Sequence, residues 1–284
     1  MATPPRSAPS LVLQSPELDA ARAAEAAALT GAAAVEPLGA HAYRLRGAAP
    51  REALAGWCRE RRLDWAWVPP GRRLQDLRLV AMDMDSTLIT IECIDELGAI
   101  AGRRGEISAV TARAMRGEIP YAASLRQRVQ LLAGLDEDAL EEVYDEKLRL
   151  APGAERLAAQ CRERGIAMLL VSSGFSFFTE RLRARLGFAD TLSNLLEVEG
   201  GRLTGRVLGT VVDAEEKAGK FRAVAQRLGA ARAQTCAVGD GANDLAMMAE
   251  AGLSVAWRAK PVVRERAACA LDYSGLDGIL NLFG

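Results

Sequence analysis

Residues 79–88 read LVAMDMDSTL, an apolar run that leads into two aspartates and a pair of hydroxyl side chains. A short apolar run bounded by turn residues predicts a buried strand of a parallel sheet. Ligands of open parallel sheets bind beyond the carboxyl ends of the strands, so Asp83 and Asp85 are expected at a binding site. Their carboxylates point to one side and repel each other, which favours a hard cation such as Mg²⁺ beside them. An isolated Asp-x-Asp is also typical of a solvated turn, and the rest of the chain has to decide between the two interpretations.

The composition excludes several classes of partner. Half of the 284 residues are hydrophobic, which predicts one large or two modest domains with a sizeable core. A formal net charge of −1 gives no argument for a nucleic acid or an anionic membrane surface. The sequence has no apolar run of roughly 18 residues and no signal-peptide core, so no membrane partner is expected.

The cysteines and the single histidine argue against several catalytic mechanisms. The five cysteines are dispersed, without a Cys-x-x-Cys pair, which fits reduced thiols and a cytoplasmic location. No cysteine has an arginine six positions later, so the phosphate-binding loop of cysteine phosphatases is absent. The only histidine is His41, far from the other candidate residues. This argues against a histidine phosphatase, a serine triad and a histidine zinc site.

Residues 11–70 predict a small α+β domain after a loose tail, residues 1–10. Strands and helices follow the β-α-β-β-α-β order of a ferredoxin-like unit. The predicted elements are 11–14, 16–29, 33–37, 42–45, 50–61 and 64–68. Residues 69–73, PPGRR, are a plausible linker. The domain carries no cluster of reactive side chains, and packing, dimerisation and small-molecule sensing all stay open as its role.

A mostly helical and charged segment, about residues 91–151, follows the two aspartates. Residues 121–132 and 137–149 carry apolar side chains at helical spacing. An insertion directly after the polar end of a strand predicts a helical cap that excludes water and confers specificity.

Strands and helices then alternate to the end of the chain. Strands are predicted at 166–171, 235–238 and 253–256, a hairpin at 195–198 and 203–208, and helices at 154–164, 176–186, 215–228, 245–251 and 276–282. This alternation predicts a doubly wound, Rossmann-like parallel sheet with right-handed crossovers. The expected fold class is therefore α/β with a helical cap insert, preceded by the ferredoxin-like domain.

Polar side chains gather at three of the predicted strand ends. They are Asp83 and Asp85, then Ser172 and Ser173, then Asp240, Asn243 and Asp244, with Lys217 near the start of the intervening helix. A carboxylate can accept a phosphoryl group covalently, and a divalent cation offsets the charge between it and a phosphate. Hydroxyl, N–H and ammonium donors stabilise the equatorial oxygens of a phosphoryl group. The set therefore predicts a phosphoryl-transfer site.

The same motifs resemble a known superfamily. Residues 83–87 (DMDST), 171–175 (VSSGF), Lys217 and 239–244 (GDGAND) are similar to the haloacid dehalogenase superfamily of aspartate-dependent phosphatases. Residues 92–96 (ECIDE) and 124–129 (SLRQRV) resemble its phosphoserine phosphatase family. The likeness covers residues 78–284, and the N-terminal segment is similar only in layout to ACT-like domains.

The resemblance implies roles for the catalytic residues. Asp83 is the implied nucleophile that becomes an aspartyl phosphate. Asp85 is the implied proton donor and later the general base, and its backbone carbonyl is an implied Mg²⁺ ligand. Asp83 and Asp240 are implied carboxylate ligands of the same ion, with Asp244 supporting them.

It also implies a substrate-binding set. Ser172, Ser173 and Lys217 hold the phosphate in this interpretation, and Asn243 contacts it or orders the loop. Glu92 pairs with the ammonium group of the substrate. Arg128 pairs with its carboxylate, which the planar guanidinium matches in a bidentate way. Met115 and Tyr121 line the cap side of the pocket.

The residues themselves leave alternatives open. Lys220 and Arg126 compete with Lys217 and Arg128 for their roles. Ser172, Glu92 and Asp244 also fit ordinary helix starts, and Met115 and Tyr121 fit a plain core. Ser173 stands where related proteins often have a second glycine, and Tyr121 where an aromatic ring without a hydroxyl is common.

The implied activity is Mg²⁺-dependent hydrolysis of O-phospho-L-serine, the last step of L-serine biosynthesis, by a possible homodimer. A close alternative is a phosphatase or phosphotransferase that acts on another small phosphomonoester, such as phosphohomoserine. A more distant alternative is a sensor that is merely phosphorylated at Asp83. Receiver-type sensors lack an acid two residues after the phosphorylated aspartate and lack such a cap, which favours turnover.

Overall fold

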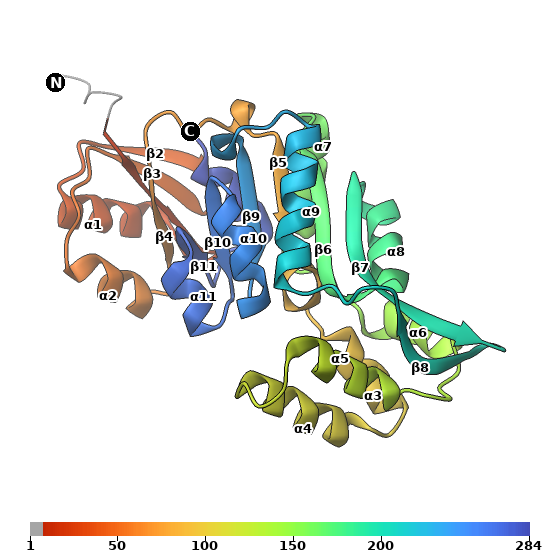
Figure 1. The fold of residues 1–284 in the computed structure, drawn as a ribbon. Coiled ribbons are helices and arrows are strands. Elements are labelled where there is room, and N and C mark those ends of the chain that lie inside the picture. The colour runs from red at the N-terminus through yellow and green to blue at the C-terminus, as the bar shows by residue number, and fades with distance from the viewer. Residues whose placement is uncertain (1–7) are drawn as a thin grey trace.

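The computed structural model describes residues 8–284 and contains a small sheet and a large sheet in that range (Figure 1). The predicted tail lies mostly outside the described residues, and Ser10 already belongs to the first strand. The small domain comprises β1 (Ser10–Gln14), α1 (Ala20–Thr30), β2 (Ala34–Gly39), β3 (Ala42–Arg46), α2 (Ala53–Glu60) and β4 (Asp64–Val68). Its strands pair antiparallel in the order β2-β3-β1-β4, as expected for a ferredoxin-like unit.

Helix α1 begins four residues later than the sequence predicts. The Asp19 side chain accepts the Arg22 N–H at 2.8 Å and caps the helix, whereas Pro16 lies in the preceding turn. Gly31, with φ of 67°, ends it. The cap residue, and not the proline, therefore sets the start of this helix.

The large sheet has the strand order β11-β10-β9-β5-β6-β7-β8, and every neighbouring pair is parallel except β7 with β8. Its elements are β5 (Leu79–Met82), α7 (Ala154–Glu163), β6 (Ala167–Phe175), α8 (Ser176–Leu186), β7 (Asp190–Glu199), β8 (Arg202–Leu208), α9 (Ala214–Arg227), β9 (Thr235–Gly239), α10 (Leu245–Glu250), β10 (Leu253–Trp257), α11 (Pro261–Arg266) and β11 (Cys269–Leu271). The α/β fold class and the mostly parallel sheet are confirmed.

Strand β5 shows that both faces of this sheet are covered. Leu79 and Ala81 pack into one apolar cluster with residues of α9 and α10. Val80 and Met82 pack into the other cluster, with residues of α7 and α8. Because side chains alternate along a strand, a strand buried on both faces appears in the sequence as a continuous apolar run.

Other differences from the predicted elements lie at the edges of the fold. Strand β7 begins at Asp190, because its first half pairs with β6 and only its second half forms the predicted hairpin. Helix α11 and strand β11 were not predicted from the sequence. The predicted helix 137–149 is α6 (Asp138–Glu142) followed by a wider turn, Val143–Lys147. The last helix, Leu276–Leu282, is of the tighter 3₁₀ type.

The cap contains α3 (Cys93–Ile100), α4 (Arg104–Met115), α5 (Tyr121–Gln130) and α6. Its two connections to the core run side by side: Thr90 N–H donates to Arg149 O and Ala151 N–H donates to Leu88 O, both at 2.9 Å. The β7–β8 hairpin also reaches the cap through Gly134 N–H and Leu203 O at 2.8 Å. The cap thus lies across the polar ends of the strands (Figure 1).

The small domain packs against the core through one face of its sheet. Val12, Ala66 and Val68 join the apolar cluster that includes Trp257 and Phe283. Helices α1 and α2 cover the opposite face in a separate cluster. No helix within residues 8–284 has the length and hydrophobicity that a membrane span requires.

Asp64 connects the small domain to the core through hydrogen bonds. Its carboxylate, 3 % exposed, accepts the backbone N–H groups of Asp272, Tyr273 and Ser274 at 2.7 to 3.3 Å. Burial raises the pKa of Asp64, and the three N–H donors oppose that shift. The start of β4 is therefore tied to the segment after β11, more than 200 residues away in the chain.

We predict that Asp64→Ala lowers the free energy of unfolding by about 3–5 kcal/mol, because three buried N–H groups lose their acceptor. Urea unfolding measures the change. Asp76→Ala is the matched control, since Asp76 pairs with Arg73 on the surface and its loss should cost less than about 1 kcal/mol. Equal effects of the two substitutions would contradict the role given to Asp64.

Candidate active site

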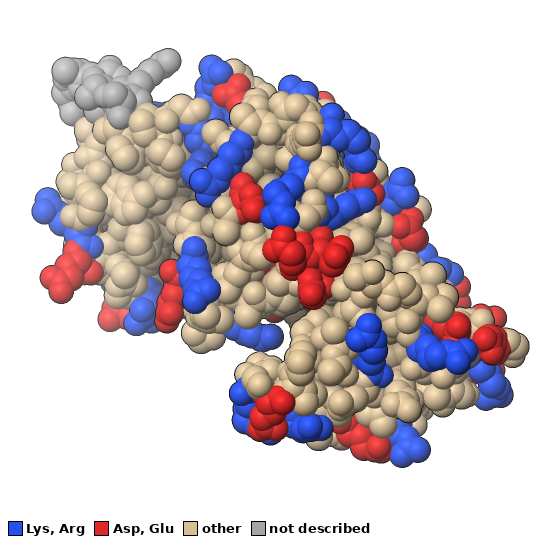
Figure 2. All heavy atoms as spheres, in the orientation of Figure 1, with Lys and Arg blue, Asp and Glu red and all other residues tan. Residues whose placement is uncertain are grey.

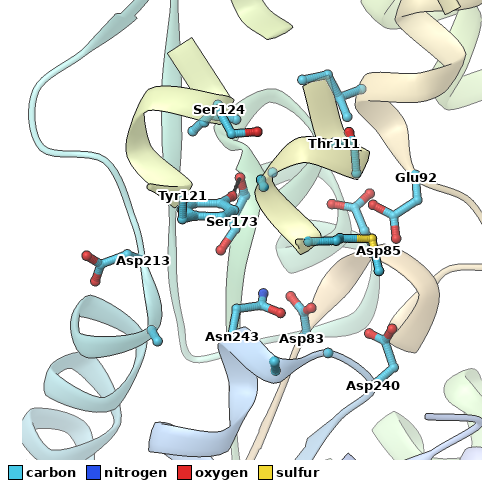
Figure 3. A pocket seen from close by; sticks show the side chains of 18 of the residues that line it. Asp83, Asp85, Glu92, Thr111, Tyr121, Ser124, Ser173, Asp213, Asp240 and Asn243 are labelled. Atoms are coloured by element: carbon cyan, nitrogen blue, oxygen red, sulfur yellow. Dashed lines mark hydrogen bonds between the residues drawn. The ribbon is translucent and has the colours of Figure 1, made fainter. Parts of the chain in front are cut away.

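The candidate site lies where three neighbouring strands end. Strands β9, β5 and β6 are adjacent in the sheet and parallel, so their carboxyl ends meet at one edge. A cavity of about 860 Å³ lies between this edge and the cap. Figure 2 shows the hollow between the main body and the smaller cap lobe, and Figure 3 shows the residues that line it.

A buried lysine joins two of the aspartates. Lys217, from the first turn of α9, is fully buried, and its Nζ lies 2.8 Å from both Asp83 Oδ1 and Asp244 Oδ1. Burial lowers the pKa of Lys217, but the two carboxylates outweigh burial and raise it above its usual value. The lysine is therefore charged and holds Asp83 and Asp244 in place.

Asp83 follows directly after β5 and is 6 % exposed. Its Oδ1 also accepts the Met84 N–H at 2.8 Å, whereas its Oδ2 accepts no hydrogen bond within the described part of the chain. Burial and the nearby Asp244 raise the pKa of Asp83, and Lys217 opposes that shift. One oxygen is thus anchored and the other is free to react or to bind a cation.

Asp244 organises the loop after β9. Its Oδ2 accepts the N–H groups of Asp240 at 3.1 Å and Gly241 at 3.0 Å. A Cβ on Gly239 would lie 2.4 Å from the Asp244 carboxylate, so only glycine leaves room for this arrangement. The loop in turn places Asp240 opposite Asp83.

Carboxylate oxygens of Asp83, Asp240 and Asp244 lie within 4.8 Å of one another. Asp240 Oδ1 accepts the Thr87 hydroxyl at 3.2 Å. Burial and the neighbouring Asp244 raise the pKa of Asp240 to about 6. Hard oxygen donors that crowd together in this way fit a divalent cation.

Asp85 sits two residues beyond Asp83 and faces the cap. Its Oδ1 accepts the Cys93 N–H at 2.9 Å, and its Oδ2 is 3.4 Å from the Ser172 hydroxyl. Burial is the main reason that the pKa of Asp85 is raised to about 7, and the negative charge of Glu92 adds to this shift. Both protonation states are therefore accessible near neutral pH, which suits a group that donates and then accepts a proton.

The polar end of β6 forms a bulge beside Asp83. The register between β6 and β7 shifts between Val171 and Phe175, which releases Ser172 to Gly174 from regular pairing. Ser172 is fully buried and accepts the Gly174 N–H at 2.8 Å, whereas Ser173 lines the cavity. A Cβ on Gly174 would lie 2.5 Å from Asp85 Oδ2, so the glycine makes room for that carboxylate.

Asn194 holds this bulge in place, and the sequence analysis missed it. Its amide N–H₂ donates to Ser173 O at 2.8 Å and Gly174 O at 3.3 Å, and its oxygen accepts the Val212 N–H at 2.8 Å. Asn194 is 1 % exposed and lies in the part of β7 for which no element was predicted. A lone asparagine in an unassigned segment gave no signal. Thr87 and Ser124 stand in the motifs at 83–87 and 124–129, but no role was predicted for either.

Helix α5 presents a polar face to the cavity. Tyr121, Ser124 and Arg128 occur at helical spacing and line it together. The Tyr121 hydroxyl donates to Ser173 O at 3.3 Å, and burial raises the pKa of Tyr121. Ser124 Oγ, Arg128 Nε and Ser173 Oγ are buried without hydrogen-bond partners among the described residues. Buried polar groups normally have partners, so these atoms are suited to a ligand.

Glu92 and Met115 complete the cap side. Glu92 Oε1 accepts the Ser86 hydroxyl at 2.7 Å, which aims the carboxylate along the cavity wall beside Asp85 (Figure 3). Met115 lines the cavity but is 69 % exposed, so it is not a core residue.

Nine of the residues selected from the sequence line the cavity. They are Asp83, Asp85, Glu92, Met115, Tyr121, Arg128, Ser173, Asp240 and Asn243. Ser172, Lys217 and Asp244 do not line the cavity. Ser172 contacts Asp85, and Lys217 contacts both Asp83 and Asp244. The competing residues lie elsewhere: Lys220 pairs with Asp190, and Arg126 is exposed outside the cavity lining.

Comparisons with known proteins agree with this geometry. A model of haloacid dehalogenase-like hydrolases matches residues 80–249, and a model of a domain of unknown function, DUF4072, matches residues 11–54. A phosphoserine phosphatase from Polaromonas sp. is 52 % identical over 218 residues, which cover 75 % of this chain and 92 % of that protein.

Solved structures are similar as well. The crystal structure of a probable phosphoserine phosphatase from Vibrio cholerae is 36 % identical with a TM-score of 0.87, and the match covers 98 % of this chain and 87 % of that one. A structure described as a phospho-aspartyl intermediate analogue of phosphoserine phosphatase is 35 % identical with a TM-score of 0.68, covering 73 % of this chain and 99 % of that one. The likeness of the small domain to ACT-like domains stays a prediction.

We predict that Lys217→Met lowers the free energy of unfolding by about 3–5 kcal/mol in the presence of EDTA, because two buried carboxylates lose their counter-charge. Urea unfolding followed by circular dichroism measures it. Lys220→Met is the matched control one helical turn later, where a partly exposed pair with Asp190 should contribute less than about 1 kcal/mol. A Lys217→Met protein as stable as the parent would rule out the anchoring role.

Proposed function

Because the chain belongs to the phosphoserine phosphatases, a family of haloacid dehalogenase-like hydrolases, we propose that it hydrolyses O-phospho-L-serine through an aspartyl phosphate on Asp83. The main support is that an Asp83 oxygen without a hydrogen bond and the Asp85 carboxylate line the same cavity, opposite one face of the cap. That face offers a carboxylate, Glu92, and a guanidinium, Arg128, to one cavity. Phosphoserine carries an ammonium and a carboxylate on one carbon, and these two side chains offer an opposite charge to each of them.

We propose Mg²⁺ as the cation of this site. Asp83 and Asp240 would hold it through carboxylate oxygens, with the Asp85 backbone carbonyl as a further ligand and Asp244 in support. When bound, the ion offsets the charge between the nucleophile and the phosphate. The all-oxygen donor set, without histidine or thiolate, supports this choice over softer metals.

In the first half of the reaction, Asp83 attacks phosphorus and the bond from phosphorus to the serine oxygen breaks. Asp85, protonated, gives its proton to that leaving oxygen. Lys217, Ser172 and the backbone of the β6 bulge would hold the phosphate oxygens, with Asn243 ordering the opposite loop.

In the second half, Asp85 is ionised and removes a proton from water. That water attacks phosphorus, the bond from phosphorus to Asp83 breaks, and inorganic phosphate leaves. A pKa of about 7 supports both roles of Asp85. The cap excludes bulk water from the cavity during the first half.

Substrate choice is proposed to depend on the cap. Glu92 would pair with the ammonium group and Arg128 with the carboxylate of phosphoserine. Arg128 Nε and Ser124 Oγ have no partners among residues 8–284, so a carboxylate at this end would satisfy both. Phosphohomoserine is longer by one methylene and is the nearest alternative substrate.

A place at the last step of L-serine biosynthesis, a cytoplasmic location and a homodimer belong to the same proposal. All five cysteines are free thiols in the structure, which supports a reducing compartment. The homodimer rests on the resemblance alone, and the molar mass in solution tests it.

The function is tested by phosphate release from O-phospho-L-serine, phosphohomoserine and p-nitrophenyl phosphate, with Mg²⁺ and then with excess EDTA. We expect strong preference for phosphoserine and loss of turnover in EDTA that added Mg²⁺ restores. Activity on the generic ester alone would keep the catalytic residues but discard the cap assignment. Turnover that persists in EDTA would refute the cation requirement.

Asp85→Asn should abolish turnover or trap phosphoenzyme on the protein. Asparagine cannot protonate the leaving oxygen well or activate water, but it leaves Asp83 intact. Quenched-flow phosphate counting and intact-protein mass measure both effects. Asp83→Asn is the control and should accumulate no phosphoenzyme. Turnover of Asp85→Asn at the parental rate would remove Asp85 from the mechanism.

Arg128→Ala should raise the KM for phosphoserine by about 10- to 100-fold, as expected for a lost charge-assisted contact. It should change turnover of p-nitrophenyl phosphate little, since that ester has no carboxylate. Arg126→Ala, two residues earlier and exposed, should behave as the parent. Equal loss on both esters would point to a folding defect instead of a carboxylate subsite.

A further inference from the structure

A second cavity, of about 500 Å³, lies between the small domain and the core. Glu17 and Arg62 line it from the small domain, and Arg258 and Tyr273 line it from the core. Cavities of this size commonly bind small molecules. The catalytic residues described above take no part in it.

The backbone of both arginines is strained. Among residues 8–284, Arg62, Arg258 and Ser86 are the residues other than glycine with positive φ, at 57°, 43° and 57°. Ser86 belongs to the catalytic turn after Asp85. Such conformations cost free energy in residues with a Cβ and concentrate at functional sites. The other two members of this small set meet in the second cavity.

Their guanidinium groups are also oriented. Arg62 lies over the Tyr273 ring at 5.4 Å and Arg258 over the Trp257 ring at 4.9 Å, measured to the ring centroids. Arg62 Nε is 3.5 Å from Glu17 Oε1, whereas Arg258 forms no ion pair within the described residues. Asp272, the other acid of the cavity, is already paired with Arg264. The cavity therefore offers oriented guanidinium donors with incomplete counter-charge.

We propose that this cavity is a second binding site for a small molecule with a carboxylate or phosphate group, held by Arg62 and Arg258. Guanidinium groups match the two oxygens of such groups in a bidentate way. Contact with an aromatic ring restricts each guanidinium group before the ligand arrives, which lowers the entropy lost on binding.

The segment after β10 links this cavity to the catalytic one. Arg258 and Ala259 line the second cavity, while Lys260 and Val262 line the catalytic cavity. The Lys260 N–H donates to Asp240 O at 3.0 Å. A ligand that shifts Arg258 therefore acts on the loop that carries Asp240, and occupancy of either cavity changes affinity at the other.

Calorimetric titration of the full chain tests the site, with inorganic phosphate and succinate as separate probes. At least one probe should bind saturably, and the probe that binds identifies the phosphate or the carboxylate as the recognised group. Arg258→Gly should weaken that binding by about tenfold or more. Glycine adopts the positive φ without strain, so this variant should melt no lower than the parent.

Two matched variants locate the binding event. Arg266→Ala removes an exposed arginine of α11 outside the cavity, whereas Ser172→Ala alters the phosphate end of the catalytic site and Arg128→Ala its carboxylate end. Binding at the second site should survive in all three variants. The site is refuted if neither probe binds in the millimolar range, if Arg258→Gly binds as the parent does, or if Ser172→Ala abolishes phosphate binding or Arg128→Ala abolishes succinate binding.

The link is tested by titrating Mg²⁺ with and without the bound probe. The apparent Mg²⁺ affinity should shift in the parent and not in Arg258→Gly. Equal affinities in the parent would refute the link. Neither titration uses turnover, so failure of the catalytic proposal would be seen separately.

Discussion

One buried ammonium group, that of Lys217, makes the carboxylate cluster possible. Four aspartates, at 83, 85, 240 and 244, surround the end of β5, and Lys217 contacts two of them at 2.8 Å. Like charges at this separation in a buried site cannot all ionise without compensation. Lys217 anchors Asp83 and Asp244, whereas Asp240 and the free oxygen of Asp83 form no ion pair within residues 8–284. That deficit is the physical reason for a divalent ion.

The parallel sheet brings the catalytic motifs together at one edge. Neighbouring β9, β5 and β6 end at one edge, so motifs about 70 to 150 residues apart in the chain meet without any long loop. Glycines at 174 and 239 leave room for Asp85 and Asp244. The cap adds Glu92 and Arg128 to the cavity, and its two connections to the core lie side by side at Thr90 and Ala151.

Sequence patterns predicted the parallel sheet, the cap and the residues at the strand ends, because each has a local signal. A buried strand is an apolar run, and its polar end marks the site. Sequence patterns could not predict features that depend on contacts between residues far apart in the chain. Asn194 and Thr87 gain their roles from strands elsewhere in the chain. Two neighbouring residues, Pro16 and Asp19, are both typical of a helix start, and only the structure shows that Asp19 caps α1. Packing of the small domain on the core, and the cavity between them, had no local signature at all.

The central claim is that Asp83 forms the covalent bond to phosphorus. Borohydride reduces an aspartyl phosphate to homoserine, so the direct measurement is peptide mass spectrometry of Asp85→Asn protein quenched with borohydride after mixing with phosphoserine and Mg²⁺. We expect homoserine at position 83 and unchanged aspartate at 240 and 244. Homoserine at another aspartate, or none in protein that has released serine, would contradict it.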